Sequence, residues 1–314
     1  YIMAHAVETM AYAGELPWHG LGVKVADDLT PREMQEAAGL DWSVEKLPMV
    51  AKAGDEEIRI PTQQALVRST DKKVLSVIGQ NWEPVQNDEA FDFFVDFVKQ
   101  GNMQMHTAGS LQDGKMVWAL AKVDDDFELF NGDKVESYLL FSNPHQYGKS
   151  IDVRFSPIRV VCNNTLTMAL NGKAGVSLDH RKAFDAQTVQ QTLGLAKESM
   201  DEYKEVAEFL GSKRYTKDSL NNYFADVFGK SSKSEKDNVI LTRNGQRALE
   251  VIDTQPGANY QKGTFWQALN AVTYMTDHEL ANTRDNRVHS AWFGGNRVKK
   301  INAVKKAVEY AQAA

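Results

Sequence analysis

One apolar repeat in the second half of the chain constrains the fold more than any other feature. Its seven members recur at alternating spacings of four and three: Val189, Leu193, Ala196, Met200, Tyr203, Ala207 and Leu210. This heptad spacing predicts one long helix with an apolar stripe along one side. The stripe must pack against something, and we expect a partner inside the same chain. An intersubunit coiled coil is the alternative, although about three heptads containing alanines are marginal alone.

Two further helices are predicted near the end of the sequence. One begins at about Phe265 and places four apolar residues on one side: Phe265, Leu269, Val272 and Met275. The last begins at about Val298 and is expected to bury Ile301, Val304 and Val308. Its lysines are expected to face water: Lys299, Lys300, Lys305 and Lys306. The second half is therefore mainly helical.

The first half alternates apolar and polar residues, which is typical of strands. Residues 64–79 are expected to form two strands about a polar turn, and Asp113-Gly114 and Asn131-Gly132 are hairpin signals. The sheet is expected to continue through ESYLLFS, IDVRF and IRVVC. Two helices interrupt it. One opens at Thr30-Pro31-Arg32-Glu33 and should end at Gly39, and one runs from about Asn87 to Gln100 with a Phe/Val stripe.

These patterns predict an α+β protein with an antiparallel, sheet-rich N-terminal domain containing short helices and a helical C-terminal domain. We place the first domain at residues 1–178 and the mainly helical domain at residues 179–314. Charge divides in a similar way, because Tyr1 to Leu140 holds 12 Lys and Arg against 24 Asp and Glu, and the remainder holds 24 against 18. An acidic half and a basic half favour a polyanionic partner or head-to-tail association between copies.

The sequence contains no recognisable catalytic motif. Cys162 follows two valines in an expected strand, where a free cysteine is usually a small buried residue. The histidines lack metal-ligand spacing, and consecutive Asp277, His278 and Glu279 would point in different directions on a helix, as expected of a solvated helix end. No phosphate-binding glycine motif occurs. We therefore expect no cofactor, no metal and no enzyme of a familiar kind, although a site built from distant residues stays open.

A basic stretch in the middle of the chain gives the best case for a ligand. Its Lys and Arg residues can neutralise phosphates, and an aromatic ring among them can stack on a base. The candidate nucleic-acid contacts are Lys149, Arg154, Arg159, Lys173, Arg181 and Lys182, with Tyr147 for stacking and Asn163 or Asn164 as polar contacts. Alternation along IDVRF puts Phe155 in the core and Arg154 toward solvent. An ordinary solvated face is the alternative interpretation.

Several phrases together resemble a known family. They are LPWHGLG, LDWSVEKLPM, VIGQNWEPVQNDEAF, TAGSLQDGKMVWALAKV, SPIRVVCNNTLTMAL, FWQALNAVTYMTDHE and SAWFGG. They are similar to the phage/plasmid-like proteins that contain the domain of unknown function 932, and they span most of the chain. The resemblance implies an origin in a virus or mobile element. It implies no particular activity.

We therefore predict a phage or mobile-element protein of DNA metabolism, one that forms a ring or filament and binds or anneals single-stranded DNA without sequence preference. The alternative is a self-assembling or host-interacting protein that binds no nucleic acid. A cytoplasmic location in the bacterial host is expected, because the single cysteine excludes an internal disulfide, no apolar run approaches the roughly 20 residues of a membrane span and no secretion signal is seen.

Overall fold

The computed structural model describes residues 7–15, 21–100, 103–130, 132–159, 164–165, 175–178, 186–232, 239–280 and 287–314. Its strands are β1 Val7–Tyr12, β2 Val23–Lys24, β3 Val44–Ala53, β4 Glu56–Arg68, β5 Val74–Gly79, β6 Met103–Leu111, β7 Met116–Leu129, β8 Asp133–Pro144, β9 Ile151–Arg159, β10 Asn164–Thr165 and β11 Gly175–Leu178. Its helices are α1 Pro31–Ala37, α2 Asn87–Gln100, α3 Ala186–Ser212, α4 Lys217–Phe228, α5 Arg243–Val251, α6 Phe265–Tyr274, the π-helix η2 Met275–Glu279, α7 Arg287–Trp292 and α8 Gly295–Gln312. All these strands precede residue 179, and the α+β prediction is confirmed.

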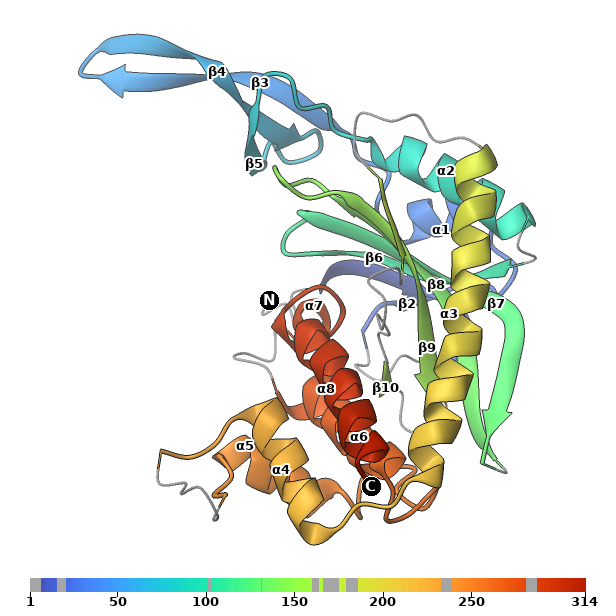
Figure 1. Ribbon diagram of the computed structural model, residues 1–314. Helices are drawn as coiled ribbons and strands as arrows, with labels where there is room; N and C mark the ends of the chain where they lie inside the picture. Colours follow the sequence, from blue (N-terminus) through green and yellow to red (C-terminus); the bar gives the residue numbers. More distant parts are fainter. Residues whose placement is uncertain are drawn as a thin grey trace. The chain divides into compact units, whose positions relative to one another are not determined.

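The larger sheet has the strand order β10-β9-β8-β7-β6-β1-β2, and β11 also pairs with β9 (Figure 1). Strand β6 is antiparallel to both β1 and β7. The predicted turn at Asp113 and Gly114 joins β6 to β7, and both residues have the positive φ that such turns require. The pairing is not antiparallel throughout, because β1 and β2 run parallel. That pair is only two residues long and leaves no periodic signal in the sequence.

The smaller sheet has the order β3-β4-β5 and is antiparallel. Strands β4 and β5 are the pair predicted for residues 64–79. Strands β3 and β4 remain paired out to Ala53 and Glu56, well past the last pair between β4 and β5 at Gln63 and Gly79. They therefore form a two-stranded ribbon that projects beyond β5 (Figure 1).

The chain forms two compact units that are interleaved in the sequence. The first contains the described parts of Tyr1–Asp124, Tyr138–Arg154 and Gly175–Gly194. The second contains the described parts of Asp125–Ser137, Phe155–Ala174 and Leu195–Ala314. The division into domains at residue 178 stays a prediction.

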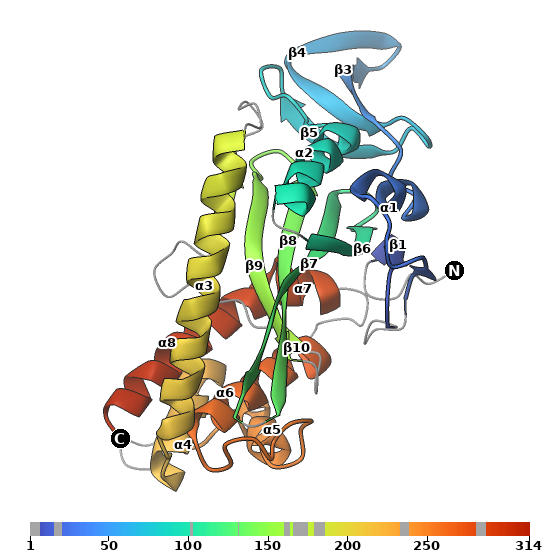
Figure 2. The same ribbon diagram turned by 90° about the vertical axis from the view of Figure 1, so that its right-hand side faces the viewer.

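In the first unit, α1 and α2 pack against each other and against β6 (Figure 2). Helix α1 begins with the predicted capping box, in which Thr30 Oγ1 accepts from Glu33 N and the Glu33 carboxylate accepts from Thr30 N. Helix α2 presents phenylalanines to the core, and the rings of Phe94 and Phe141 lie 5.5 Å apart. Phe91, Phe94 and Phe97 are at most 1% exposed. Of the predicted stripe, Phe91 and Phe94 therefore lie in the core, whereas Val95 and Val98 are only partly buried and Phe93 and Phe97 are buried in addition.

In the second unit, the C-terminal part of α3 packs against α6 and β7. The Tyr203 ring lies 6.0 Å from Trp266 and 5.8 Å from Phe127. Its heptad neighbours Met200, Ala207 and Leu210 are at most 2% exposed. A Cβ added at Gly211 would lie 2.5 Å from the Phe130 ring, so this close approach requires glycine. The described part of the heptad seam thus packs within the chain, as expected. No described helix combines the length and apolar character needed to cross a lipid bilayer.

Candidate functional site

The turn between β8 and β9 presents an aromatic ring on a fixed backbone. His145 is buried, its Nε2 lies 2.9 Å from Asn87 Oδ1, and its backbone N–H donates to Lys115 O over 2.9 Å. Two residues later, Tyr147 N donates to Ser76 Oγ on β5 over 3.3 Å. The Tyr147 ring lies near Gly79 of β5. A Cβ placed at Gly79 would be in ordinary van der Waals contact with the ring. The turn is therefore anchored at two points.

The Tyr147 side chain is 61% exposed despite this anchoring. Lys149, two residues on, is also exposed, and its backbone N–H closes the turn by donating to Gln146 O. These are the two predicted contacts that the structure places at the surface. An exposed ring on an anchored turn can stack on a planar group, while a cation on the same turn meets an anionic group.

Arg154 does not face solvent, contrary to the prediction. Its side chain is 4% exposed, and its Nη2 lies 3.0 Å from Asp152 Oδ2. The alternation argument was right about Phe155, which is 3% exposed, but β9 is covered on both faces because Ile151, Val153 and Ser156 are buried as well. The strand pattern alone cannot show that the polar face of a strand is also covered.

The remaining predicted contacts are only partly placed. Arg159 in β9 and Asn164 in β10 are cross-strand partners, so the structure brings their backbones together. Four residues lie outside the described residues: Asn163, Lys173, Arg181 and Lys182. Cys162 lies outside them too. The nucleic-acid contacts proposed for Arg159, Asn164 and these four residues stay predictions.

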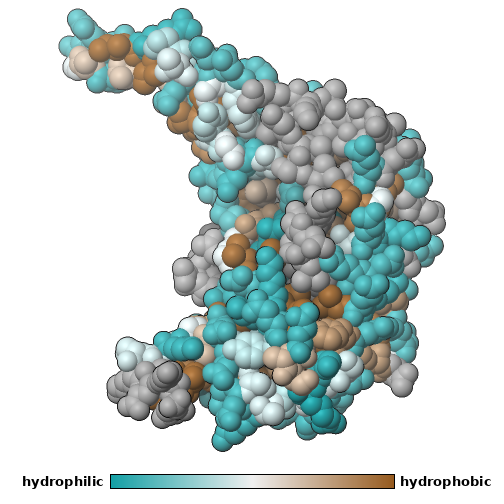
Figure 3. All heavy atoms as spheres, in the orientation of Figure 1, coloured by the Kyte–Doolittle hydropathy of each residue, from teal (hydrophilic) through white to brown (hydrophobic). Residues whose placement is uncertain are grey.

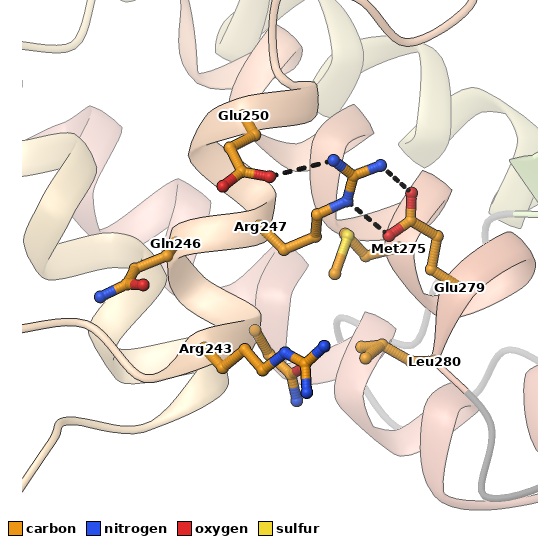
Figure 4. A pocket seen from close by; sticks show the side chains of 8 residues that line it. Arg243, Gln246, Arg247, Glu250, Met275, Glu279 and Leu280 are labelled. Atoms are coloured by element: carbon orange, nitrogen blue, oxygen red, sulfur yellow. Dashed lines mark hydrogen bonds and ion pairs between the residues drawn. The ribbon is translucent and has the colours of Figure 1, made fainter.

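Sequence reasoning missed a pocket of about 580 Å³ in the second unit. Its lining comes from α5 and from the segment around η2: Arg243, Asn244, Gln246, Arg247, Glu250, Met275, Glu279 and Leu280 (Figure 4). A π-helix carries an extra residue per turn and occurs often at functional sites. Here η2 directs Glu279 toward α5 (Figure 4).

An ion-pair cluster forms one wall of this pocket. Arg247 donates from Nε and Nη2 to the two oxygens of Glu279, each over 2.8 Å, and from Nη1 to Glu250 over 3.0 Å (Figure 4). Hydrogen bonds to Glu279 and Glu250 raise the pKa of Arg247 above its usual value. Because two carboxylates hold Arg247, it is not available to a ligand.

Arg243 lies one helical turn before Arg247, at the first position of α5, and extends along the pocket toward Leu280 (Figure 4). It is exposed and makes no ion pair with any residue that the structure describes. Its guanidinium can therefore take a carboxylate or phosphate in the two-pronged geometry typical of arginine. Only one feature of the sequence could have pointed to Arg243 as a candidate, namely its position directly after Thr242, the residue that caps α5.

The residues of η2 also correct two predictions. Asp277 is 1% exposed, so it does not form a solvated helix end, and its Oδ1 accepts from Lys300 Nζ over 2.7 Å. Lys300 is 0% exposed, whereas the sequence placed it on the wet side of the last helix. His278 lies against the Tyr274 ring, so the three consecutive residues do diverge, as expected. Among the described residues no cluster of three or more His, Cys, Asp or Glu could hold a metal ion.

Comparison with known proteins gives one match. A family model described as "Domain of unknown function (DUF932)" matches residues 74–297. No curated protein and no solved structure matches the chain. The matched range contains the Tyr147 turn and the whole pocket lining, and it begins at the first residue of β5.

Proposed function

Because the chain belongs to the DUF932 family, whose description assigns no activity, we propose a function from its surfaces: it is an oligomeric DNA-binding protein that binds and anneals single strands without sequence preference. The observation that carries the proposal is Tyr147, which is 61% exposed although its backbone N–H is held by Ser76 Oγ. Bases of a single strand present open faces to such a ring.

Charge supports phosphate binding next to this ring. Lys149 is exposed on the same turn, and the basic residues predicted further along belong to the same stretch of sequence: Arg159, Lys173, Arg181 and Lys182. Arg243 adds an available cation in the second unit. Arg154 leaves the proposed set because Asp152 already holds it. Phosphate contacts of this kind release counterions, so binding should weaken steeply with salt.

An origin in a phage or mobile element and a cytoplasmic location in its host are part of this proposal. The alternative function, assembly without nucleic acid, is favoured by a different observation, the exposed Val74 and Val77 of the smaller sheet. Binding to an oligonucleotide separates the two functions.

The test is fluorescence anisotropy with a labelled oligothymidine of about 30 nucleotides, at about 50 and 300 mM salt. Tyr147→Leu should weaken binding about 10-fold, because one stacked base contributes about 1–3 kcal/mol, and Tyr147→Trp should preserve it. Lys149→Glu and Arg243→Glu should each weaken binding and flatten its salt dependence. Lys262→Glu is the matched control, since Lys262 is 68% exposed and lies outside the proposed contacts.

Two results would contradict the proposal. The first is no binding by the unmodified protein at low salt. The second is equal loss from Lys262→Glu and Lys149→Glu, which would show that overall charge rather than this surface governs binding.

A further inference from the structure

The smaller sheet concentrates the exposed apolar residues of the molecule. Eight large apolar side chains are at least 39% exposed among the described residues, and five of them lie on β3, β4 and β5. Those five are Leu47, Val50, Ile58, Val74 and Val77. Hydrophobic atoms run along the projecting ribbon (Figure 3). Single exposed apolar residues are ordinary, but a contiguous group marks an interaction surface.

Strand register places most of this group on one face. Alternate residues along a strand share a face, and so do cross-strand partners, so Leu47, Met49 and Ala51 of β3 define one face together with their partners. The register shifts between Pro48 and Met49, where β4 holds three extra residues, so Met49 pairs with Ile60. The pairings give three successive rows: Leu47–Ala65–Val77, Met49–Ile60 and Ala51–Ile58. Every member of these rows is apolar, and we call them together the apolar face. From strand spacings each residue on one face covers about 33 Å², so the seven members cover about 230 Å², a little less than the largest apolar patch of a typical monomer.

The opposite face of the sheet is already used. Near its base Val44, Leu66 and Ile78 are at most 5% exposed and belong to the core. Along the ribbon this side carries the pairs Val50–Arg59 and Lys52–Glu57, which are exposed and mostly charged. Thus the uncovered residues of the opposite face are mostly charged, whereas those of the apolar face are all apolar.

The two edges of the sheet are protected against strand addition. Pro48 lies within the edge strand β3 and cannot donate a ladder hydrogen bond. On the other edge, the Tyr147 turn bonds to Ser76 of β5. These features oppose strand addition at β3 and at β5, whereas β4 past Gln63 pairs with no described strand on the β5 side, and we consider a partner that covers the apolar face.

We propose that the occupant of the apolar face is the same face of a second copy of this chain. The rows are self-complementary about a two-fold axis that lies between two stacked sheets and crosses the strands at Met49 and Ile60. Such an axis places Leu47 over the partner's Ala51 and Ala65 over the partner's Ile58. Large residues then meet small ones, which fills the space between sheets about 10 Å apart.

The charged surroundings of the apolar face fit the same arrangement. The ribbon tip carries three exposed acids, Asp55, Glu56 and Glu57, and the antiparallel stacking carries this tip to the partner's sheet base. There Lys72 is 65% exposed and held only loosely, 3.5 Å from Glu45. A stable dimer buries about 800 Å² per subunit, so about 230 Å² of dry centre needs a polar rim of this kind.

This association does not depend on nucleic acid, so it is tested without any. Sedimentation equilibrium from about 1 to 100 µM should show a dimer for the unmodified chain. Ile58→Glu should weaken dimerisation about 100-fold, because each dimer would bury two carboxylates in its dry centre. Val50→Glu is the matched control: Val50 is 48% exposed and Ile58 53%, on the same ribbon but on opposite faces. It should leave the dimer intact.

A second measurement locates the axis. In a Cys162→Ser background, Met49→Cys should cross-link to itself through a bismaleimide with a spacer of about 8 Å, since sheets about 10 Å apart are too distant for a disulfide. Val50→Cys should cross-link far less. The proposal is overturned if the unmodified chain stays monomeric at 100 µM, which would leave the face to a different protein, or if Val50→Glu and Ile58→Glu weaken the dimer equally.

Discussion

Arg68 connects three parts of the first unit that are distant in the sequence. Its Nη1 and Nη2 donate to the Glu8 carboxylate over 2.7 and 2.8 Å, and Nε and Nη2 donate to Asp71 over 2.9 and 2.6 Å. Its guanidinium carbon also lies 5.4 Å from the centre of the Trp42 ring. Arg68 is only 6% exposed, so its five donors must be satisfied inside the protein. The sequence did not reveal this cluster because Glu8 and Arg68 are 60 positions apart.

The Arg68 cluster predicts an acid-sensitive contribution to stability. Hydrogen bonds from Arg68 hold the pKa of Asp71 well below its usual value. A carboxyl with a lowered folded pKa stabilises the fold above its unfolded pKa, near 3.8, and this stability disappears as pH falls toward the folded pKa. Asp71→Asn should therefore lower stability at pH 7 and flatten its decline at acidic pH.

Urea unfolding at a series of pH values from about 7 to 3 measures this effect. Asp41→Asn is a suitable control, because Asp41 is exposed and lies outside the cluster. If the Asp71→Asn and unmodified curves run parallel through the acidic range, Arg68 does not stabilise the charged form of Asp71.

Among the elements, those specified by adjacent residues were predicted best. The capping box from Thr30 to Glu33 needs only four consecutive positions, and α1 begins where it predicts. Helix α8 was found, but its buried face was misjudged. The prediction followed Ile301, Val304 and Val308, whereas the buried face contains Lys300, Ala303, Val304, Ala307 and Ala311. Small alanines mark a face that packs closely, and Lys300 lies at helical spacing with them. The prediction missed this face because it assigned Lys300 to solvent on account of its charge.

The π-helix η2 had no sequence signal at all. An α-helical period predicts that α6 simply continues through residue 279, and it cannot foresee an added residue per turn. Asn296 of α8 holds the C-terminal end of η2. Its Nδ2 donates to Thr276 O over 2.8 Å and also to Leu280 O. The widened turn directs Asp277 to α8 and Glu279 to α5. The pocket was missed for this reason, because its residues come from two segments joined only by tertiary contacts.

The buried pair between η2 and α8 makes a prediction about the stability of this element. Lys300 and Asp277 are 0% and 2% exposed at the side chain, so removing one charge leaves the other in a medium that cannot solvate it. Lys300→Met should cost about 3–5 kcal/mol of unfolding free energy. The double variant Lys300→Met, Asp277→Leu should recover much of that loss, since the second change removes the buried carboxylate that has lost Lys300.

A double-mutant cycle by urea unfolding at neutral pH gives the coupling energy. Lys299→Met on the same helix is the control, because Lys299 is partly exposed and its described contacts are weak, a hydrogen bond to Val227 O over 3.4 Å and the Phe228 ring 5.8 Å away. Losses that simply add in the double variant would show that the pair is not coupled.

For the whole molecule, the sequence predicted a sheet-rich part followed by a helical part but not how the chain distributes between them. Residues 125–137 come from the ends of β7 and β8, yet they belong to the same compact unit as residues 195–314. Their aromatic residues explain why. Phe130 lies 5.8 Å from Trp266, Phe127 lies 5.8 Å from Tyr203, and Tyr260 Oη donates to Gly132 O over 3.0 Å. Periodicity reports each segment separately, so it cannot show that a hairpin tip completes a helical core.

This interleaving predicts that the chain cannot be divided at residue 178. A fragment of residues 179–314 lacks Phe127 and Phe130, and the loss of one buried phenylalanine side chain typically costs about 3–5 kcal/mol. Two such losses approach the whole stability of an average domain, about 5–15 kcal/mol.

The fragment should therefore keep helical far-UV circular dichroism but lose the near-UV signal of Trp266 and sharp amide NMR dispersion. Adding residues 1–178 in trans should restore both signals, because that fragment carries the missing hairpin. If residues 179–314 alone give a cooperative unfolding transition and native dispersion, the hairpin is dispensable and the helical part is an independent domain.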